Sequence, residues 1–310
     1  MSQLSYRVRP PACIGVYSAD PTRLKQQLEQ LFVAPGGPGL PAPDAARPPG
    51  QRLRAILAPH MDYTRGGTVY GWAFKELIQS TDARLFFIIA TSHYSLQRFT
   101  LTRQDFATPL GPVLTDRACV DRLCELYGPG LFNDPHAHTR EHSIELEVVL
   151  LQYLTYQRQP VRILPLLVGS LADCVDQRRD PAEQPDLARM VRALRQLEAE
   201  AGEPVCYLIS GDLAHIGRKF GDRYRLDAPR LHASRQQDEQ ILAAAEQADP
   251  REYFARIAQE DDCRRICGLP PTWVALSAAQ PKVGRLLQYR QYVAPDKSES
   301  VSFAAMSFWD

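Results

Sequence analysis

The sequence has no excess charge of either sign and no long hydrophobic run. Its 310 residues include 36 Lys and Arg and 36 Asp and Glu, so the formal net charge is zero. This balance argues against a general electrostatic affinity for nucleic acid or an anionic membrane, and we expect neither partner. The longest apolar stretches, residues 85–90 and 161–168, are of strand length, below the ~18 residues that span a bilayer. The composition therefore predicts a globular chain without a membrane span.

Several common catalytic and structural signatures are also missing. The sequence contains no GxGxxG after a strand-like run, no Walker A segment and no GxSxG elbow, so nucleotide cofactors and serine hydrolysis have no support. The absence of HExxH and CxxC removes the common zinc hydrolase and zinc finger patterns. Seven cysteines without paired spacing are unlike a disulfide framework. Because the N-terminus also lacks the apolar segment of a signal peptide, we expect a reducing, cytoplasmic location.

Apolar, strand-like runs alternate with amphipathic, helix-like segments along most of the chain. This alternation is typical of a mixed or parallel sheet covered on both faces. We therefore expect an α/β fold: one large domain, residues 1–310, with a central mixed β-sheet flanked by helices. Strands are expected at residues 54–59, 84–90, 99–106, 161–169, 205–209, 285–293 and 300–309. Helices are expected at residues 68–78, 117–126, 143–156, 187–199, 234–245, 250–259 and 270–279. Two segments rich in Pro, Gly or charge, 36–49 and 173–185, are predicted as loop excursions.

Three of the seven histidines come shortly after apolar strand-like runs. His60, His93 and His215 each follow such a run within six residues. Open α/β sheets bind their ligands just outside the carboxyl ends of the strands. A single histidine in this place is more often a structural residue, but three together favour a functional site.

Two short segments add candidate polar groups. In EHSIELEVVLLQY, His142 and Glu145 stand three residues apart at the start of an expected helix, which puts them on one face. An acidic residue there is equally explained by helix capping. In SGDLAH, Asp212 and His215 could form a carboxylate–imidazole pair for acid–base catalysis. Alternatively, Asp212 caps a helix start and His215 is an exposed polar residue.

Cys267 is the cysteine with the most suggestive surroundings. It precedes a Gly and two prolines at the start of an expected helix, where the helix N-terminus would lower the pKa of the thiol. The alternative is a small buried hydrophobic residue. Two imidazoles with one thiolate or carboxylate form a good site for a first-row transition metal. Imidazole suits iron, copper, zinc and nickel, and a thiolate shifts the preference toward Cu(I), zinc or iron.

Several segments, in order along the chain, resemble one known family. They are LAPHMDYTRGGTVYGWAFKEL, FFIIATSHYS, EHSIELEVVLLQ, ILPLLVGS, LISGDLAHIG and ICGLPP. This set resembles the Memo family, whose prokaryotic members are called AmmeMemoRadiSam system protein B. The family is structurally similar to the catalytic subunits of LigB-type class III extradiol dioxygenases. The resemblance therefore implies an α/β protein with non-haem metal at one end of a central sheet.

The resemblance implies a metal centre at His60 in the APH segment, His93 in TSH and Cys267 in ICG. The cysteine stands where the dioxygenases have a carboxylate ligand. The implied metal is iron (Fe2+) or copper, with zinc possible. Because a thiolate changes the electronics and net charge of the metal, the resemblance does not imply ring cleavage.

Further roles follow from the same resemblance. His215 matches the acid–base histidine of the dioxygenases, with Asp212 beside it, and His142 would orient substrate or oxygen. Glu145 shares with His142 the EHSIE motif, which lines the pocket. Many family members read PHAGY where this sequence has PHMDY, so Asp62 is an additional carboxylate that could orient an imidazole or bind the ion. The Arg-Gly-Gly that follows could hold an anionic group or simply begin a helix.

Three functions are compatible with these residues. The first is a metal-dependent, dioxygenase-like oxidoreductase acting on a small molecule. The second is a non-enzymatic module, because Memo proteins have been linked to phosphopeptide recognition and to metal handling. The third is an accessory role beside a radical SAM enzyme, which the prokaryotic family name suggests. The first two use the same pocket.

Overall fold

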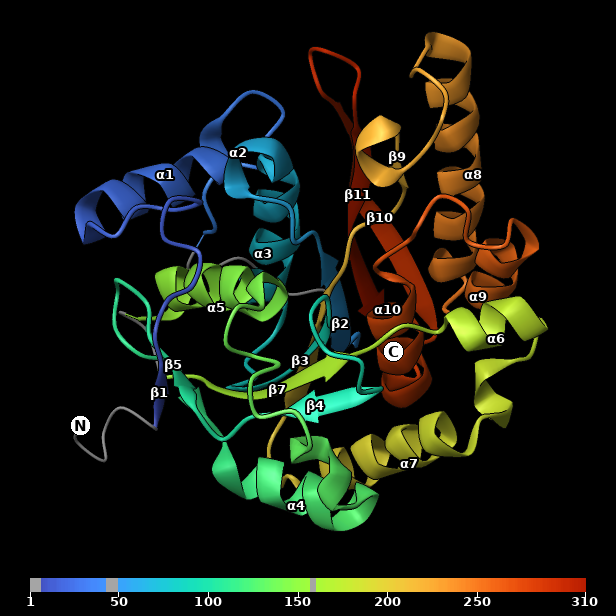
Figure 1. Cartoon of the computed structure of the whole chain (residues 1–310). Helices are drawn as coiled ribbons and strands as arrows, with labels where there is room; N and C mark the ends of the chain where they lie inside the picture. Colours follow the sequence, from blue (N-terminus) through green and yellow to red (C-terminus); the bar gives the residue numbers. More distant parts are fainter. Residues whose placement is uncertain (1–6, 43–49, 157–159) are drawn as a thin grey trace.

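The computed structural model describes residues 7–42, 50–156 and 160–310 (Figure 1). The strands are β1 (Val8–Arg9), β2 (Leu53–Ala58), β3 (Leu85–Thr91), β4 (Phe99–Leu101), β5 (Asp105–Phe106), β6 (Leu114–Thr115), β7 (Arg162–Val168), β8 (Val205–Ser210), β9 (His215–Ile216), β10 (Val283–Val293) and β11 (Ser300–Trp309). The α-helices are α1 (Pro21–Val33), α2 (Tyr63–Gly66), α3 (Thr68–Ser80), α4 (Arg117–Tyr127), α5 (His142–Thr155), α6 (Ala172–Gln177), α7 (Pro185–Glu200), α8 (Ala228–Glu246), α9 (Pro250–Gln259) and α10 (Leu269–Ala279). Three short 3-10 helices are η2 (Pro129–Phe132), η3 (Pro181–Glu183) and η4 (Arg218–Phe220).

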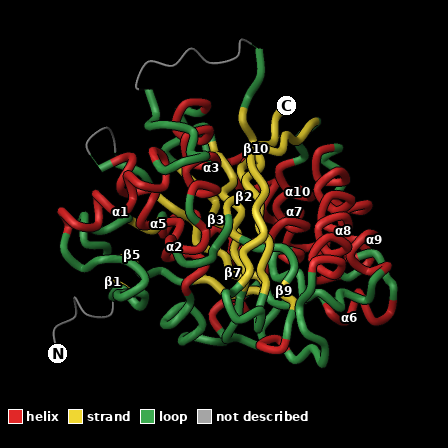
Figure 2. Tube along the Cα trace, turned by 90° about the horizontal axis from the view of Figure 1, so that it is seen from above, coloured by secondary structure: helices red, strands yellow, loops and turns green. Residues whose placement is uncertain are grey.

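A mixed β-sheet lies between two groups of helices, which confirms the expected α/β fold. Its strand order is β10-β11-β2-β8-β3-β7-β4, with β6 beside β7 and β9 beside β11. Strands β2, β8, β3 and β7 run parallel, and β10, β11 and β4 are antiparallel to their neighbours. Figure 2 shows α1, α3 and α5 on one side of the sheet and α7, α8, α9 and α10 on the other. No helix formed by the described residues is both long and apolar enough to cross a membrane.

Alternate residues of the central strands face two separate hydrophobic cores. In β3, Phe87 and Ile89 pack in the core under α7 and α10, whereas Phe86 and Ile88 pack in the core under α1, α3 and α5. Successive side chains of a strand point to opposite faces of the sheet. A strand buried on both faces must therefore be apolar throughout, which is why these segments read as unbroken apolar runs.

The expected strands and helices are present, with two differences. The single strand expected at 99–106 is two strands, because β4 pairs with β7 and β5 pairs instead with β1. The loop predicted at 173–185 is wrong, since the chain there forms α6, η3 and the start of α7. Cys174 and Val175 of α6 are buried in the core, and Pro185 occupies the first turn of α7, where a missing N–H costs nothing. The other predicted loop is irregular at 36–42, and its remainder, 43–49, lies outside the described residues.

Candidate metal centre

The carboxyl ends of three neighbouring strands bring His60, His93 and Asp212 together. Strand β8 pairs in parallel with β2 on one side and with β3 on the other, so the segments that leave these strands start next to one another. His60 follows β2, His93 follows β3 and Asp212 follows β8. Helix α5 packs across this end of the sheet and adds His142 from its first turn. The site therefore lies where an open α/β sheet normally places a ligand.

Five side chains form two overlapping groups with ligand spacing. His60, His93 and His142 form the first, and their ring centroids are 4.6–5.2 Å apart. His60, Asp212 and Cys267 form the second, in which the Cys267 Sγ lies 3.1 Å from His60 Nε2. In each group the ligand atoms lie within 4.8 Å of one another. His93 and Cys267 thus join one cluster but belong to different groups, and His60 belongs to both.

Two glycines allow the loops that carry Asp212 and Cys267 to touch. A Cβ on Gly211 would lie 2.5 Å from the Cα of Gly268, and a Cβ on Gly268 would lie 2.6 Å from the main-chain oxygen of Asp212. The Gly268 N–H donates to that oxygen at 2.8 Å. The Thr91 hydroxyl, at the end of β3, donates to the Cys267 carbonyl at 2.7 Å. Only residues without a side chain permit this approach, which holds the thiol beside His60.

Glu141, which sequence patterns alone did not identify, orients the imidazole of His93 and lies beside that of His142. As the N-cap of α5 it accepts hydrogen bonds from the helix main chain, and its Oε1 lies 2.9 Å from His93 Nδ1 and 3.3 Å from His142 Nδ1. Burial raises the pKa of Glu141, but its hydrogen bonds and charge interaction with His93 outweigh this and hold the pKa at about 2. The carboxylate therefore keeps a proton on His93 Nδ1 and leaves Nε2 with a free lone pair. In the sequence, Glu141 could have been identified as an acidic residue at the N-cap position directly before His142.

Ser210 orients the imidazole of His60. Its Oγ donates to the Ser143 carbonyl at 2.7 Å and lies 3.3 Å from His60 Nδ1. Because its proton is already used, the Ser210 oxygen accepts from His60 Nδ1–H, and His60 Nε2 keeps its lone pair facing Cys267. Burial, together with the neighbouring histidines, lowers the pKa of His60 well below its usual value. The imidazole is therefore neutral, as a metal ligand must be.

The structure places Asp212 against His60 rather than His215. Asp212 is buried, its Oδ1 accepts from the His60 main-chain N–H at 3.1 Å, and its Oδ2 lies 3.6 Å from His60 Nε2. Burial raises the pKa of Asp212 to about 7. Both sequence interpretations are thus wrong: Asp212 contacts His60 instead of pairing with His215, and no helix starts at Asp212, because the short strand β9 follows it and His215 is half-buried.

His215 is held by main-chain carbonyls. Its Nδ1 lies 3.0 Å from the Leu213 oxygen and 3.1 Å from the Arg265 oxygen. Carbonyls only accept hydrogen bonds, so Nδ1 carries the proton and Nε2 is the basic nitrogen. Burial lowers the pKa of His215 to about 4, which leaves the ring neutral at pH 7. His215 can therefore receive a proton at Nε2.

Glu145 does not line the pocket, which corrects the expectation from the EHSIE motif. It is buried and accepts hydrogen bonds from Arg9, the main-chain N–H groups of Ala12 and Cys13, and the Tyr17 hydroxyl. Three residues along a helix correspond to directions about 60° apart, enough to send one side chain to the cluster and the other to the N-terminal segment. Glu145 thus anchors that segment to α5.

Asp62 orients no imidazole. It is the N-cap of α2, accepts from the Arg65 N–H at 3.0 Å and pairs with the Arg65 guanidinium. Arg65 and Lys219 both also contact Glu299, at 3.4 and 2.7 Å. The extra carboxylate of the PHMDY segment is therefore part of an ion-paired rim beside the cluster. In the Arg-Gly-Gly that follows, Arg65 and Gly66 end α2 and Gly67 is the N-cap of α3.

Cys267 is not a low-pKa thiol in the free protein. Burial raises its pKa well above the usual value, and the Asp212 carboxylate raises it further. This direction is opposite to the one expected from the helix N-terminus, because burial and the Asp212 carboxylate both disfavour the thiolate. A bound cation would reverse the balance, since a thiol that coordinates a metal ion loses its proton. The donor set of imidazoles, thiol and carboxylate fits a first-row transition metal.

The imidazoles and Asp212 of the cluster line a hollow of about 390 Å³. Its apolar lining residues are Val16, Met61, Leu146, Phe220 and Val301. Its polar lining residues are four histidines, Asp212 and the ion-paired rim. Such a hollow is large enough for a small molecule beside the imidazoles.

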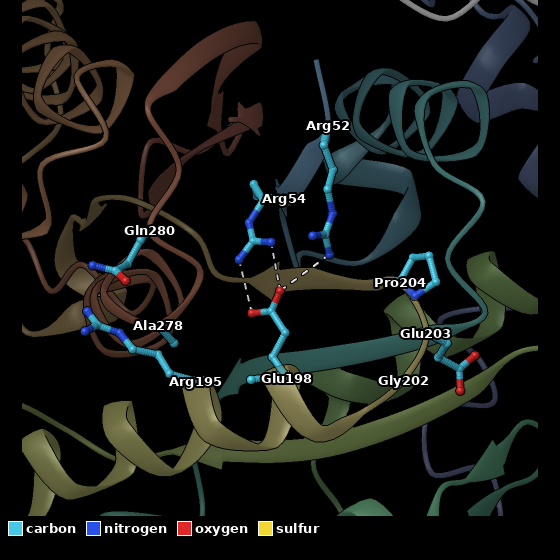
Figure 3. Close-up of a pocket in the computed structure, with 10 residues that line it drawn as sticks. Arg52, Arg54, Arg195, Glu198, Gly202, Glu203, Pro204, Ala278 and Gln280 are labelled. Carbon is cyan, nitrogen blue, oxygen red and sulfur yellow. Dashed lines mark hydrogen bonds and ion pairs between the residues drawn. The ribbon is translucent and has the colours of Figure 1, made fainter. Parts of the chain in front are cut away.

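A larger hollow, about 700 Å³, lies at the opposite end of the sheet (Figure 3). There Glu198 pairs with Arg54 at 2.8 Å and with Arg52 at 3.5 Å. Arg54 also donates to the Ala279 carbonyl in the last turn of α10 at 2.8 Å. Arg54 thus caps the C-terminal end of α10, and both arginines pair with the same carboxylate, Glu198. Among the described residues that line this hollow there is no histidine or cysteine, so its size does not make it the functional site.

Comparisons with known proteins agree with the motifs. The Memo-like protein family matches residues 9–307. A MEMO1 family protein of Aquifex aeolicus is 27% identical over 263 residues, which cover 83% of this chain and 64% of that protein. A MEMO1 family protein of Sulfolobus acidocaldarius is 26% identical over 313 residues, covering 98% and 100%. Protein MEMO1 of Xenopus laevis is 27% identical over 269 residues, covering 85% and 84%. A solved structure, an uncharacterized protein of Escherichia coli K12, aligns with a TM-score of 0.47 and 16% identity, covering 83% of this chain and 100% of that one.

Proposed function

The chain belongs to the Memo family, and from this premise we propose that it binds a first-row transition-metal ion, iron or copper, around His60. One observation carries the proposal: three imidazoles, a thiol and a carboxylate, distant in sequence, meet at ligand spacing. Zinc is compatible with the same donors. Glu141 and Ser210 support the proposal, because carboxylates and hydroxyls that fix the second ring nitrogen are typical of metal-binding histidines.

We further propose a dioxygenase-like oxidoreductase acting on a small molecule in the hollow. When bound, iron or copper would supply Lewis-acid and one-electron chemistry. His60 and His93 would hold the ion through Nε2. The Cys267 thiolate, whose Sγ lies 3.1 Å from His60 Nε2, would join them after a small movement of the side chains, because His93 and Cys267 belong to different ligand groups. His215 would take up a proton at Nε2, and His142 would orient the reactant. The apolar residues that line the hollow would help to exclude water from these groups.

Replacing His60 by alanine tests the metal proposal. Because His60 belongs to both ligand groups, we expect metal content to fall at least about 10-fold. The measurement is elemental analysis of protein purified without oxygen. His136→Ala, at an exposed histidine that belongs to neither ligand group, is the matched control and should keep the wild-type metal content. Unchanged metal in the His60 variant rejects the proposal.

Replacing Glu141 by glutamine tests the orienting role. The amide removes the negative charge that holds the proton on His93 Nδ1. We expect metal affinity to fall about 10- to 100-fold, measured by competition with a chelator of known affinity. Glu239→Gln, on the exposed face of α8, should leave the affinity unchanged. Equal affinities for Glu141→Gln and the wild type would contradict the assignment.

Metal handling without turnover is the second candidate, and the overlap of two ligand groups on one histidine favours it. Oxygen uptake by the reduced, iron-loaded protein with catechol-like compounds separates the two candidates. Uptake supports the oxidoreductase, whereas tight metal binding without uptake supports metal handling. Phosphopeptide binding and a radical SAM partner stay predictions from the family resemblance.

A further inference from the structure

We propose that a third hollow, lined by α7, α10 and the start of α9, binds a small organic acid with an apolar body. The hollow measures about 410 Å³, which is within the size range of small-molecule sites. Three features carry the inference: an apolar lining, two arginines without an acidic partner, and an indole N–H without an acceptor. The hollow shares no residue with the two ligand groups around His60, so the inference does not depend on the proposed metal function.

Most of the lining is apolar. Helix α10 contributes Trp273 and Leu276, and α7 contributes Ala188 and Val191. Short segments around these helices add Ala182, Ala248, Pro250 and Pro281. Trp273, Leu276 and Val191 also belong to the hydrophobic core under this layer of helices. An apolar body in the hollow would remove apolar surface of both partners from water, which favours binding.

The charged residues that line the hollow are both positive. Arg192 and Arg195 line it, and no acidic residue does. They stand three residues apart in α7, so they lie on neighbouring turns of one side of the helix. Arg195 is held against α10, because its Nε and Nη2 donate to the Ser277 carbonyl at 3.1 and 2.5 Å. Neither guanidinium group pairs with a carboxylate of the described residues.

The neighbouring 700 Å³ hollow, which Arg195 also lines, has its positive charges neutralised. There Arg52 and Arg54 both pair with Glu198. The side chain of Arg195 extends away from Glu198 and toward Gln280 (Figure 3). Like charges on neighbouring turns of a helix repel each other, and a carboxylate between two guanidinium groups would replace this repulsion by charge-assisted hydrogen bonds. The unpaired arginines therefore favour an anionic ligand.

Trp273 supplies an unused hydrogen-bond donor in the wall of the hollow. It is 2% exposed, and its Nε1–H has no acceptor within the part of the chain that the structure describes. The other two indoles each have one, since Trp72 donates to the Gly36 carbonyl at 2.9 Å and Trp309 to the Ser307 hydroxyl at 3.0 Å. A buried donor without an acceptor is costly. A bound ligand can supply the missing acceptor after a small rotation of the ring.

Cinnamate is the probe, and cinnamamide is its uncharged counterpart of the same shape. Binding to the full chain is followed through the three indole N–H signals in NMR spectra, with the Trp273 signal assigned from Trp273→Phe. We expect the Trp273 signal alone to move, with a Kd of about 1 mM or lower. Arg192→Gln and Arg195→Gln should each weaken cinnamate binding at least about 10-fold. The amide should bind at least about 10-fold more weakly than the acid.

Arg189→Gln is the matched control, because Arg189 lies in the same helix but contacts Tyr127 and does not line the hollow. It should bind cinnamate like the wild type, and so should His60→Ala. The inference is overturned if cinnamate leaves the Trp273 signal unmoved, if acid and amide bind alike, or if the two hollow-lining arginine variants bind like Arg189→Gln. Loss of binding in His60→Ala would assign cinnamate to the metal cluster and also overturn it. The three arginines are exposed, so their variants should fold, which circular dichroism checks.

Discussion

Replacing Arg9 by methionine is expected to lower the free energy of unfolding by about 3–5 kcal/mol. Arg9 and Glu145 form an ion pair with an N–O distance of 2.5 Å in which both side chains are 1% exposed. Methionine leaves the Glu145 carboxylate buried without its counter-charge, and an unpaired buried charge is strongly destabilising. Chemical denaturation at pH 7 measures the effect.

The matched control is Arg256→Met, which breaks an ion pair of similar length on the surface of α9. Arg256 and Glu252 lie 2.6 Å apart, with side chains 44% and 43% exposed, so the expected loss is about 0.3–0.5 kcal/mol. In the double variant Arg9→Met, Glu145→Met the loss should be smaller than in Arg9→Met alone, because no charge is left buried. If Arg9→Met lowered the free energy of unfolding by less than about 1 kcal/mol, as expected for an exposed ion pair, the Arg9–Glu145 pair would not act as a buried anchor.

The loss in the free energy of unfolding caused by Arg9→Met should also depend on pH. Burial raises the pKa of Glu145, but the Arg9 charge and the hydrogen bonds from Tyr17 and Ala12 lower it more, so its folded-state pKa lies below the ordinary 4.5. A depressed folded pKa contributes stability that is present above the ordinary value and is lost as pH falls through the folded value. The difference between wild type and Arg9→Met should therefore shrink under acid conditions.

Replacing Glu147 by methionine is expected to stabilise the protein at pH 8 by about 1–3 kcal/mol. Glu147 lies in α5 and is fully buried, and neither carboxyl oxygen makes a well-formed hydrogen bond within the described part of the chain. Methionine has a similar size and removes the buried polar atoms. Denaturant unfolding at several pH values measures the gain.

The direction in which the stability gain of Glu147→Met changes with pH follows from the pKa of the Glu147 carboxyl group. Burial raises the pKa of Glu147 well above the ordinary 4.5, and the Asp212 carboxylate raises it further. A raised folded pKa gives stability that is complete below the ordinary value and is lost as pH rises. The advantage of methionine should thus grow from pH 4.5 to pH 8. Glu147→Gln, which cannot ionise, should remove the same pH dependence, and a methionine variant that is less stable at pH 8 would contradict the interpretation.

Local sequence patterns were enough to predict most of the fold. Unbroken apolar runs such as 85–90 predicted strands buried on both faces, because a central strand of this sheet contacts a hydrophobic core on each side. The same patterns put His60 and His93 at strand ends, and the motif around His142 at a helix start. Prolines misled the prediction at 173–185, since a proline suits the first turn of a helix as well as a loop.

Only the tertiary structure decided which polar groups meet. The insertion of β8 between β2 and β3 sets Asp212 beside His60, although about 150 residues separate them in the chain. Whether Glu141 or Glu145 faces the imidazoles depends on how α5 is rotated against the sheet and against the N-terminal segment. Periodicity reports whether a side chain is buried, because burial follows from the local backbone period. The partner of a buried polar group depends on segments distant in sequence, so it is fixed only when those segments pack.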